Sequence, residues 1–480
     1  MIWSDSAQTD MDEVRVTGVS LAAIRRVLVA GTSSQLRRNT LAGAASAVAG
    51  ALMAAVSYPI YLHFLGYEQY GLWLAVSVVL SFAAYGQLGL APAVATKVSE
   101  DLSRGDFAGI RTTVSTALLT LTVVGLAVVA GVLILGGYII GAMRLSTALA
   151  LEARGLLPFV ALLSLYVVQI ETLNSVLIGL GRLDLSVGTQ ILSRALSLAV
   201  SASLLAAGVG VMSLPIANMA GYAFLHLASL TLTRRITGHG CLALRGFDFA
   251  RLRKLASFGS GIFASSMMGL LLGPLNKFAL TRYAGPGSVP VYELAWGLSM
   301  QLRSLLESGF RSLMPEVSRL AALGSSESAG RITSVNRRAI KLILAVGLPA
   351  FALVFLVAAP CLRFWLGARF RPEIVPALRV LLVGCFLNLL GVPGYYTLVG
   401  LGRIKQIITS QVAQAFTNAG LLSTIGLLSS RASTGSTAAA AAAGIAVGGL
   451  YCFYAARVRP RGGANPVSLH METSTGEVAF

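Results

Sequence analysis

Charged residues are scarce in this sequence. Asp, Glu, Lys and Arg make up 12% of its 480 residues and hydrophobic residues make up 55%, whereas about 25% of the residues in soluble domains are charged. This deficit excludes a soluble globular protein. Apolar runs of about 20 residues, long enough to cross a bilayer as a helix, recur along the chain instead. We therefore predict an all-α membrane protein, because a β-barrel would show short alternating segments.

Cysteine and histidine are also rare, and neither forms a recognisable site. The cysteines lack CxxC spacing and the histidines lack an HExxH pattern, which excludes the usual zinc sites and a disulfide framework. We expect no metal, no cofactor and no enzyme activity. The residues concerned are Cys241, Cys361, Cys385, Cys452, His63, His226, His239 and His470.

Twelve apolar segments are long enough to span a membrane. The segments on the same side of the membrane as the N-terminus contain more than three times as many Arg and Lys residues as the loops on the other side. Because positive loops stay in the cytoplasm, we expect both termini to be cytoplasmic, in a bacterial inner membrane. The predicted spans are residues 40–62, 71–91, 113–142, 156–180, 185–207, 211–233, 256–281, 289–313, 340–362, 376–400, 405–428 and 435–456.

The loop asymmetry also explains most of the formal net charge of +18. Basic clusters at the inner face attract anionic phospholipid, so the membrane itself is a partner. We expect no nucleic-acid partner, because no internal loop is long enough to hold a soluble binding domain. These clusters include Arg234, Arg235, Arg251, Arg253 and Lys254.

The chain repeats itself over a long distance. IGLGRLDLSVGTQ at 178–190 returns as VGLGRIKQIITSQ at 399–411, so that Gln190 matches Gln411. Weaker echoes at similar offsets pair 64–66 with 283–285 and 98–99 with 317–318. Six spans in each half make the repeats parallel, and two such bundles around a central cleft are typical of an alternating-access transporter.

This repeat predicts the organisation of the chain. A cytoplasmic N-terminal segment lacks the basic start of a signal peptide, and its residues 16–29 are either an amphipathic surface helix or a disordered lead-in. A basic cytoplasmic linker joins the two bundles, and a polar tail ends the chain. The expected divisions are 1–35, 36–233, 234–255, 256–456 and 457–480.

The glycines of the repeated stretch have two interpretations. Glycine and arginine at the end of a helix are typical of a C-cap and of favourable charge at the helix dipole. An anion-binding nest is the alternative, but neither copy has a GxGxxG or Walker pattern. We favour the cap, and we infer no nucleotide site.

Several segments together resemble a known family. YPIYLHFLGYEQYGLWLAVSVVLSFAAYGQLGLAPAVATKVSEDLSRGD at 58–106 is similar to the start of bacterial polysaccharide transporters, the Wzx-type flippases of the MATE-like MOP superfamily. The resemblance covers about residues 35–455. It implies transfer of an undecaprenyl-diphosphate-linked oligosaccharide to the outer leaflet, with a polymerase and other polysaccharide-assembly proteins as further partners. The other similar segments are FALTRYAGPGSVPVYELAWGL (278–298), SLMPEVSRL (312–320), FWLGARF (364–370) and GLGR (400–403).

Ionisable residues inside spans are candidates for the site, because they are costly in a membrane. Lys277, Arg311 and Arg379 lie near span ends and could reach the interface, whereas Arg194 and Arg303 lie near the middle of theirs. Arginine suits a diphosphate because its planar guanidinium makes paired hydrogen bonds to phosphate. We predict a substrate-binding cationic lumen that contains Arg194, Arg303, Arg311 and Lys277.

Acids inside spans leave an alternative open. Arg303 could simply pair with Glu307 and Arg194 with Glu171, which would tie helices together. Glu171, Glu293 and Glu307 are candidates for counter-charges or for ion coupling. The resembled family often has an acid near the position of Asn276, so the asparagine here leaves the coupling ion open.

Aromatic and small residues complete the pattern. We interpret an aromatic cluster near the outer ends of the first two spans as an interfacial belt, with sugar stacking as the alternative. Small residues at 42–51 and 438–444 predict close helix packing. The aromatic residues are Tyr58, Tyr61, Tyr67, Tyr70 and Trp73.

Three function classes compete. A membrane glycosyltransferase or polymerase would need acids beside a large outer loop, and the outer loops here are short. An ion-coupled drug or cation antiporter would need an acidic cavity. The basic excess inside the spans favours an anionic, lipid-linked cargo, so a flippase is our prediction and the antiporter is the alternative.

Overall fold

The computed structural model describes residues 21–85, 89–237, 246–257, 272–310, 313–323, 326–429 and 433–456. Within these ranges the regular structure is entirely helical, with no strand. Eight helices of the described residues are long and apolar enough to cross a membrane. The chain is therefore a multi-pass α-helical membrane protein, as predicted.

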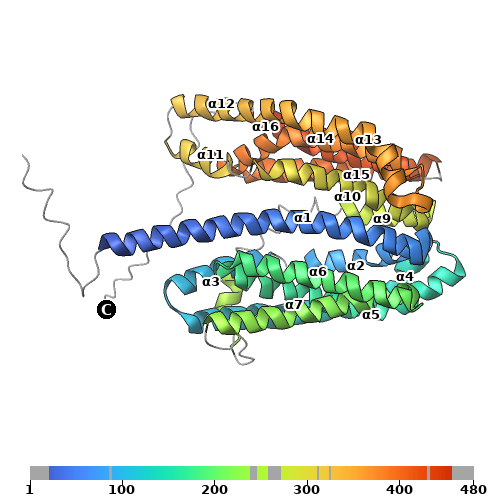
Figure 1. Ribbon diagram of the computed structural model, residues 1–480, viewed down its shortest axis with the longest axis horizontal. Helices are drawn as coiled ribbons and strands as arrows, with labels where there is room; N and C mark the ends of the chain where they lie inside the picture. Colours follow the sequence, from blue (N-terminus) through green and yellow to red (C-terminus); the bar gives the residue numbers. More distant parts are fainter. Residues whose placement is uncertain are drawn as a thin grey trace, which may run out of the picture.

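Two groups of helices lie on either side of a long first helix (Figure 1). We call the group up to residue 237 the N half and the group from residue 272 the C half. The N half contains α1 (Leu21–Val76), α2 (Val78–Tyr85), α3 (Leu90–Ser103), α4 (Phe107–Ala142), α5 (Thr147–Gly179), α6 (Leu183–Ala206), η1 (Gly210–Met212) and α7 (Ser213–Thr237).

The C half has the same general order of elements. A short helix at 249–257 lies between the halves in the sequence. The C half contains α9 (Leu272–Ala284), η2 (Pro286–Ser288), α10 (Val289–Ser308), α11 (Leu313–Ala322), α12 (Ser326–Leu342), the π-helical η3 (Ile343–Gly347), α13 (Leu348–Leu366), η4 (Gly367–Arg369), α14 (Ile374–Gly400), α15 (Ile404–Ser429) and α16 (Thr434–Ala455).

The predicted boundaries are wrong at the second and eighth spans. The second span is divided among the end of α1, α2 and α3. The eighth ends at Ser308, and α11 resumes at Leu313. Apolar composition continues across both breaks, so hydropathy alone did not reveal them. The seventh predicted span falls partly outside the described residues.

Matching glycines break the chain at matching places in the two halves. Gly66 interrupts α1 with φ 68° and ψ −174°, and Gly285 separates α9 from η2 with φ 83° and ψ 159°. Residues other than glycine rarely adopt a positive φ, because their Cβ would clash with the backbone. The weak echo between 64–66 and 283–285 therefore records a shared backbone bend.

The repeated GLGR stretch forms the same helix end twice. Gly181 and Gly402 have φ values of 75° and 67°. Arg182 N–H donates to Leu177 O at 2.9 Å, and Arg403 N–H donates to Leu398 O at 2.9 Å. These are the long-range bonds of a Schellman motif. The capping interpretation is confirmed.

The other glycine of this stretch is needed for helix packing. A Cβ on Gly179 would lie 2.9 Å from Val98 Cβ, and one on Gly400 would lie 2.9 Å from Val317 Cγ1. Val98 on α3 and Val317 on α11 are themselves repeat partners. One glycine in each half thus allows close packing, of α3 against the end of α5 and of α11 against the end of α14.

Replacing Gly402 with alanine should destabilise the folded protein by about 1 to 2 kcal/mol, because in the left-handed conformation the alanine Cβ lies too close to the following carbonyl oxygen. Gly420 provides a matched control, since it lies within α15 with open space around its Cα. Gly420→Ala should leave stability unchanged or raise it. Heat unfolding of both purified variants in detergent measures the effect, and equal stability of the two would contradict the cap.

Small residues bring α14 and α16 together. A Cβ on Gly384 would lie 2.6 Å from Ala442 Cα, and Gly391 packs directly on the backbone of Gly449. No larger side chain fits at either glycine without a shift of the facing backbone. The close packing predicted for residues 438–444 is confirmed, whereas the stretch at 42–51 falls partly outside the described side chains.

The predicted aromatic belt is wrong for three of its members. Tyr67, Tyr70 and Trp73 are all buried inside the protein, so they do not face a lipid interface. Tyr67 Oη donates to Arg369 O at 2.7 Å, and the Arg371 guanidinium lies 4.0 Å from the centre of the Tyr67 ring. Tyr67 thus packs α1 against the C half, whereas the Tyr70 ring contacts Tyr58 and Tyr61 of α1 itself.

Contacts between the halves run from the region of Gly66 along α1, as far as Ala47, whose carbonyl accepts from Gln301 Nε2 at 3.1 Å. Trp365 Nε1 donates to Ala55 O at 2.9 Å, and Arg282 donates to Ala142 O at 2.6 Å. Gly71 packs on the backbone of Pro286. At the opposite end, α3 and α11 lie apart on either side of α1 (Figure 1). The molecule is joined at one end and spread at the other.

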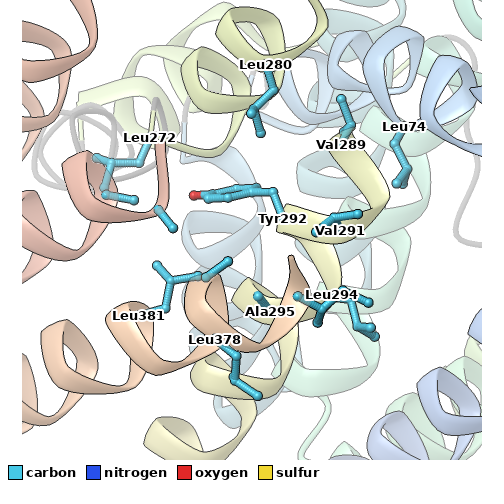
Figure 2. Packing of buried hydrophobic residues seen from close by; sticks show 14 of the residues in the cluster. Leu74, Leu272, Leu280, Val289, Val291, Tyr292, Leu294, Ala295, Leu378 and Leu381 are labelled. Carbon is cyan, nitrogen blue, oxygen red and sulfur yellow. The ribbon is translucent and has the colours of Figure 1, made fainter. Parts of the chain in front are cut away.

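The core of the C half surrounds Tyr292. Its ring is 1% exposed and lies among Leu272, Leu280 and Leu381, as Figure 2 shows. Leu74 of α1 belongs to the same cluster. The core therefore continues from the C half into the joint with the N half.

Candidate functional site

Each half encloses one polar cavity between equivalent helices. The N-half cavity lies among α5, α6 and α7 and has a volume of about 300 Å³. The C-half cavity lies among α14, α15 and α16, is closed by α10, and measures about 430 Å³. Gln190 lines the first and its repeat partner Gln411 lines the second. Both volumes fall in the range of small-molecule sites.

Arg194 is the unpaired cation of the N-half cavity. It lies near the middle of α6, and its side chain is exposed to the cavity. Glu171 of α5 lines the same cavity, yet among the described residues no carboxylate is within 4.0 Å of Arg194. A Cβ on Gly50 would lie 3.7 Å from Arg194 Nη1, so the guanidinium points toward α1. The predicted pairing with Glu171 is therefore not formed.

Arg303 is paired in the C-half cavity. Its Nη1 lies 3.0 Å from Glu307 Oε2, and its Nε donates to Asn388 Oδ1 at 2.7 Å. Tyr396 Oη donates to the other Glu307 oxygen at 3.2 Å, and Asn388 Nδ2 donates to Ile445 O at 2.7 Å. The predicted Arg303–Glu307 pair is formed, within α10, and the Asn388 bond ties α10 to α14.

Arg303 and its partner Asn388 occupy different positions along their helices. It is close to the end of α10, because that helix stops at Ser308 rather than near residue 313. Asn388, however, occupies the middle of α14. The predicted position in the middle of a span is therefore wrong for the Arg303 backbone, while its guanidinium contacts the middle of α14.

The remaining predicted residues lie away from both cavities. Lys277 Nζ on α9 lies 3.0 Å from Glu293 Oε1 on α10. Asn276 is fully buried and its Nδ2 donates to Tyr292 Oη at 2.8 Å. Arg379 Nε donates to Phe355 O at 3.2 Å. Arg311 lies outside the described residues.

The structure therefore does not gather the predicted residues in one lumen. Glu171 and Arg194 share one cavity, Arg303 and Glu307 share the other, and Lys277 and Glu293 tie α9 to α10. Opposite charges thus accompany each other in every described group. Arg194 is distinct because its donors have no partner among the described residues.

Neutral polar side chains of the cavities were missed by a search for charges. Asparagine and glutamine inside apolar spans are the available signal, and the repeated glutamine of the GLGR stretch was already visible. Aromatic residues at the same helices add to the C-half cavity. The missed residues are Asn218 and Tyr222 in the N half and Trp296, Asn388, Gln411, Gln414, Tyr395 and Tyr396 in the C half.

Comparison with known proteins agrees with this architecture. A family model described as "Polysaccharide biosynthesis protein" matches residues 36–321, which is more than half of the chain. No curated protein sequence matches the chain.

Three solved structures share the fold at low sequence identity. The lipid II flippase MurJ, in an inward closed conformation, aligns with a TM-score of 0.69 and 14% identity over 87% of each chain. An inward-facing multidrug resistance MATE family transporter of the MOP superfamily aligns with a TM-score of 0.66 and 16% identity, over 86% of this chain and 98% of its own. A MOP superfamily transporter from Pyrococcus furiosus gives 0.54 and 16%, over 88% and 92%.

Proposed function

The chain belongs to the family of polysaccharide biosynthesis proteins, and from this premise we propose that it is a flippase for an undecaprenyl-diphosphate-linked oligosaccharide. The fold that it shares with a lipid II flippase and with MATE transporters supports membrane transport by alternating access. The cargo would cross the bacterial inner membrane to serve surface polysaccharide assembly, with polymerase and assembly proteins acting next.

Arg194 carries the assignment of an anionic cargo. A guanidinium near the middle of a span is costly in a bilayer, and this one has no carboxylate within 4.0 Å among the described residues. No described residue engages its five N–H donors, which can bind phosphate oxygens bidentately. An arriving diphosphate would satisfy donors that the protein leaves open.

The arrangement of the halves supports an inward-open state. The halves are joined near Gly66, the end that the distribution of positive loops places outside, and they spread at the end of α3 and α11. Cargo would therefore enter from the cytoplasmic leaflet. Labelling a cysteine at the exposed Phe64 from outside intact cells tests this orientation.

Deleting the gene should abolish one surface glycan and leave its lipid-linked repeat unit in the cytoplasmic leaflet, because polymerisation follows translocation. Surface glycan can be measured by gel and lectin staining, with the wild-type gene on a plasmid as control.

The competing antiporter function is favoured by Glu171, an exposed acid in the N-half cavity with no ion pair among described residues. Normal glycan together with increased sensitivity to cationic drugs would establish that alternative.

A further inference from the structure

We infer that the C-half cavity is a carbohydrate subsite, which binds sugar residues of the cargo while the N-half cavity takes its diphosphate. The inference rests on the proposed function, because it divides one cargo between two cavities. The cavities are repeat-equivalent in their helices but differ in their chemistry. Three features of the C-half cavity make that difference and assign each part of the cargo.

Aromatic faces are the first feature. Trp296, Tyr395 and Tyr396 line the C-half cavity. The Trp296 ring stacks on the buried Tyr292 with centroids 5.9 Å apart and planes 23° apart, which fixes its orientation. The negative face of an aromatic ring attracts positively polarised edges, and the C–H bonds of a pyranose ring present such an edge. These rings therefore suit a sugar.

Open amide groups are the second feature. Gln411 and Gln414 line the cavity from α15, and neither side chain has a hydrogen-bond partner among the described residues. An amide donates and accepts at once, which matches a pair of neighbouring hydroxyl groups. In the N half, by contrast, the Gln190 amide donates to Ser186 Oγ at 3.4 Å.

Neutralised charge is the third feature. Arg303 is held by Glu307 at 3.0 Å and by Asn388 at 2.7 Å. The Glu307 carboxylate, itself bonded by Tyr396, offsets the charge of this guanidinium and would repel an incoming anion. A neutral, hydroxyl-rich ligand needs no such exchange. Its hydroxyl groups would meet an environment that offers donors and acceptors without net charge.

The test measures binding of two probes to the full-length protein in nanodiscs by calorimetry. The probes are inorganic pyrophosphate and the free oligosaccharide that mild acid releases from the host's lipid-linked pool. Gln414→Leu and Gln411→Leu should each weaken oligosaccharide binding about threefold to tenfold, because each removes hydrogen bonds. Pyrophosphate binding should change less than about twofold.

Gln190→Leu is the matched control, since it alters the repeat partner of Gln411 in the other cavity. Its oligosaccharide affinity should equal that of the wild type. Trp296→Phe should retain most of that affinity and Trp296→Leu should lose it, which keeps the test valid where one glutamine variant folds poorly.

The outcomes separate the subsite from the proposed function. Wild-type oligosaccharide affinity in both C-half glutamine variants, or equal loss in Gln190→Leu, would overturn the subsite. Absence of oligosaccharide binding to the wild-type protein would overturn it as well. Oligosaccharide binding with no pyrophosphate binding would support the subsite while contradicting the diphosphate role of the N-half cavity.

Discussion

Arg194→Gln is expected to reduce surface-glycan export about 100-fold or more at unchanged protein abundance. The substitution removes the guanidinium that lines the N-half cavity. Among the described residues, no carboxylate lies within 4.0 Å of this guanidinium. A 100-fold loss corresponds to about 2.7 kcal/mol, within the range of charge-assisted hydrogen bonds to a bound anion. The measurement is glycan export in the deletion strain, normalised to the variant in the membrane.

Two further substitutions define what Arg194 contributes. Arg194→Lys keeps the charge but loses the planar fork, so export should fall only about tenfold. Arg379→Gln is the matched control, because Arg379 is another arginine within a span but donates to Phe355 O outside both cavities. Its export per folded molecule should stay at the wild-type level. Full export by Arg194→Gln would exclude the diphosphate contact.

Features that depend on local chemistry were predictable from the sequence. The membrane helices were predictable because a run of about 20 apolar residues is stable as a helix inside the bilayer, whatever its neighbours. The helix caps were predictable from the GLGR repeat, because the residue that ends a helix in the left-handed conformation is usually glycine. The Arg303 and Glu307 pair followed from their i, i+4 spacing, which places both side chains on one helix face.

Features that depend on packing between distant segments were not predictable. Nothing in the sequence near Arg194 says that Glu171 will remain beyond ion-pair distance, because that depends on how α5 and α6 meet. The environment of Tyr67 depends on the C half, which supplies Arg369 and Arg371. The breaks at Ser77, between α1 and α2, and at Gly309, at the end of α10, likewise fall within spans that a hydropathy window joins.

Arg303→Leu is expected to lower the stability of the folded protein by about 3 kcal/mol. It leaves Glu307 as a largely buried charge with Tyr396 as its remaining partner, and it leaves Asn388 Oδ1 without its donor. Breaking one side of a buried pair is strongly destabilising, whereas replacing both partners with apolar groups is often neutral. The double variant Arg303→Leu with Glu307→Leu should therefore recover most of the lost stability.

Heat unfolding of the two single variants, the double variant and the wild type gives the coupling energy of the pair. The reversed pair, Arg303→Glu with Glu307→Arg, restores opposite charges but not the fit to Asn388, whose Oδ1 now accepts from Arg303. It should recover only part of the stability. Wild-type stability of Arg303→Leu would contradict the structural role. A stable double variant that still exports glycan would show that Arg303 serves the C half by pairing and makes no required contact with cargo.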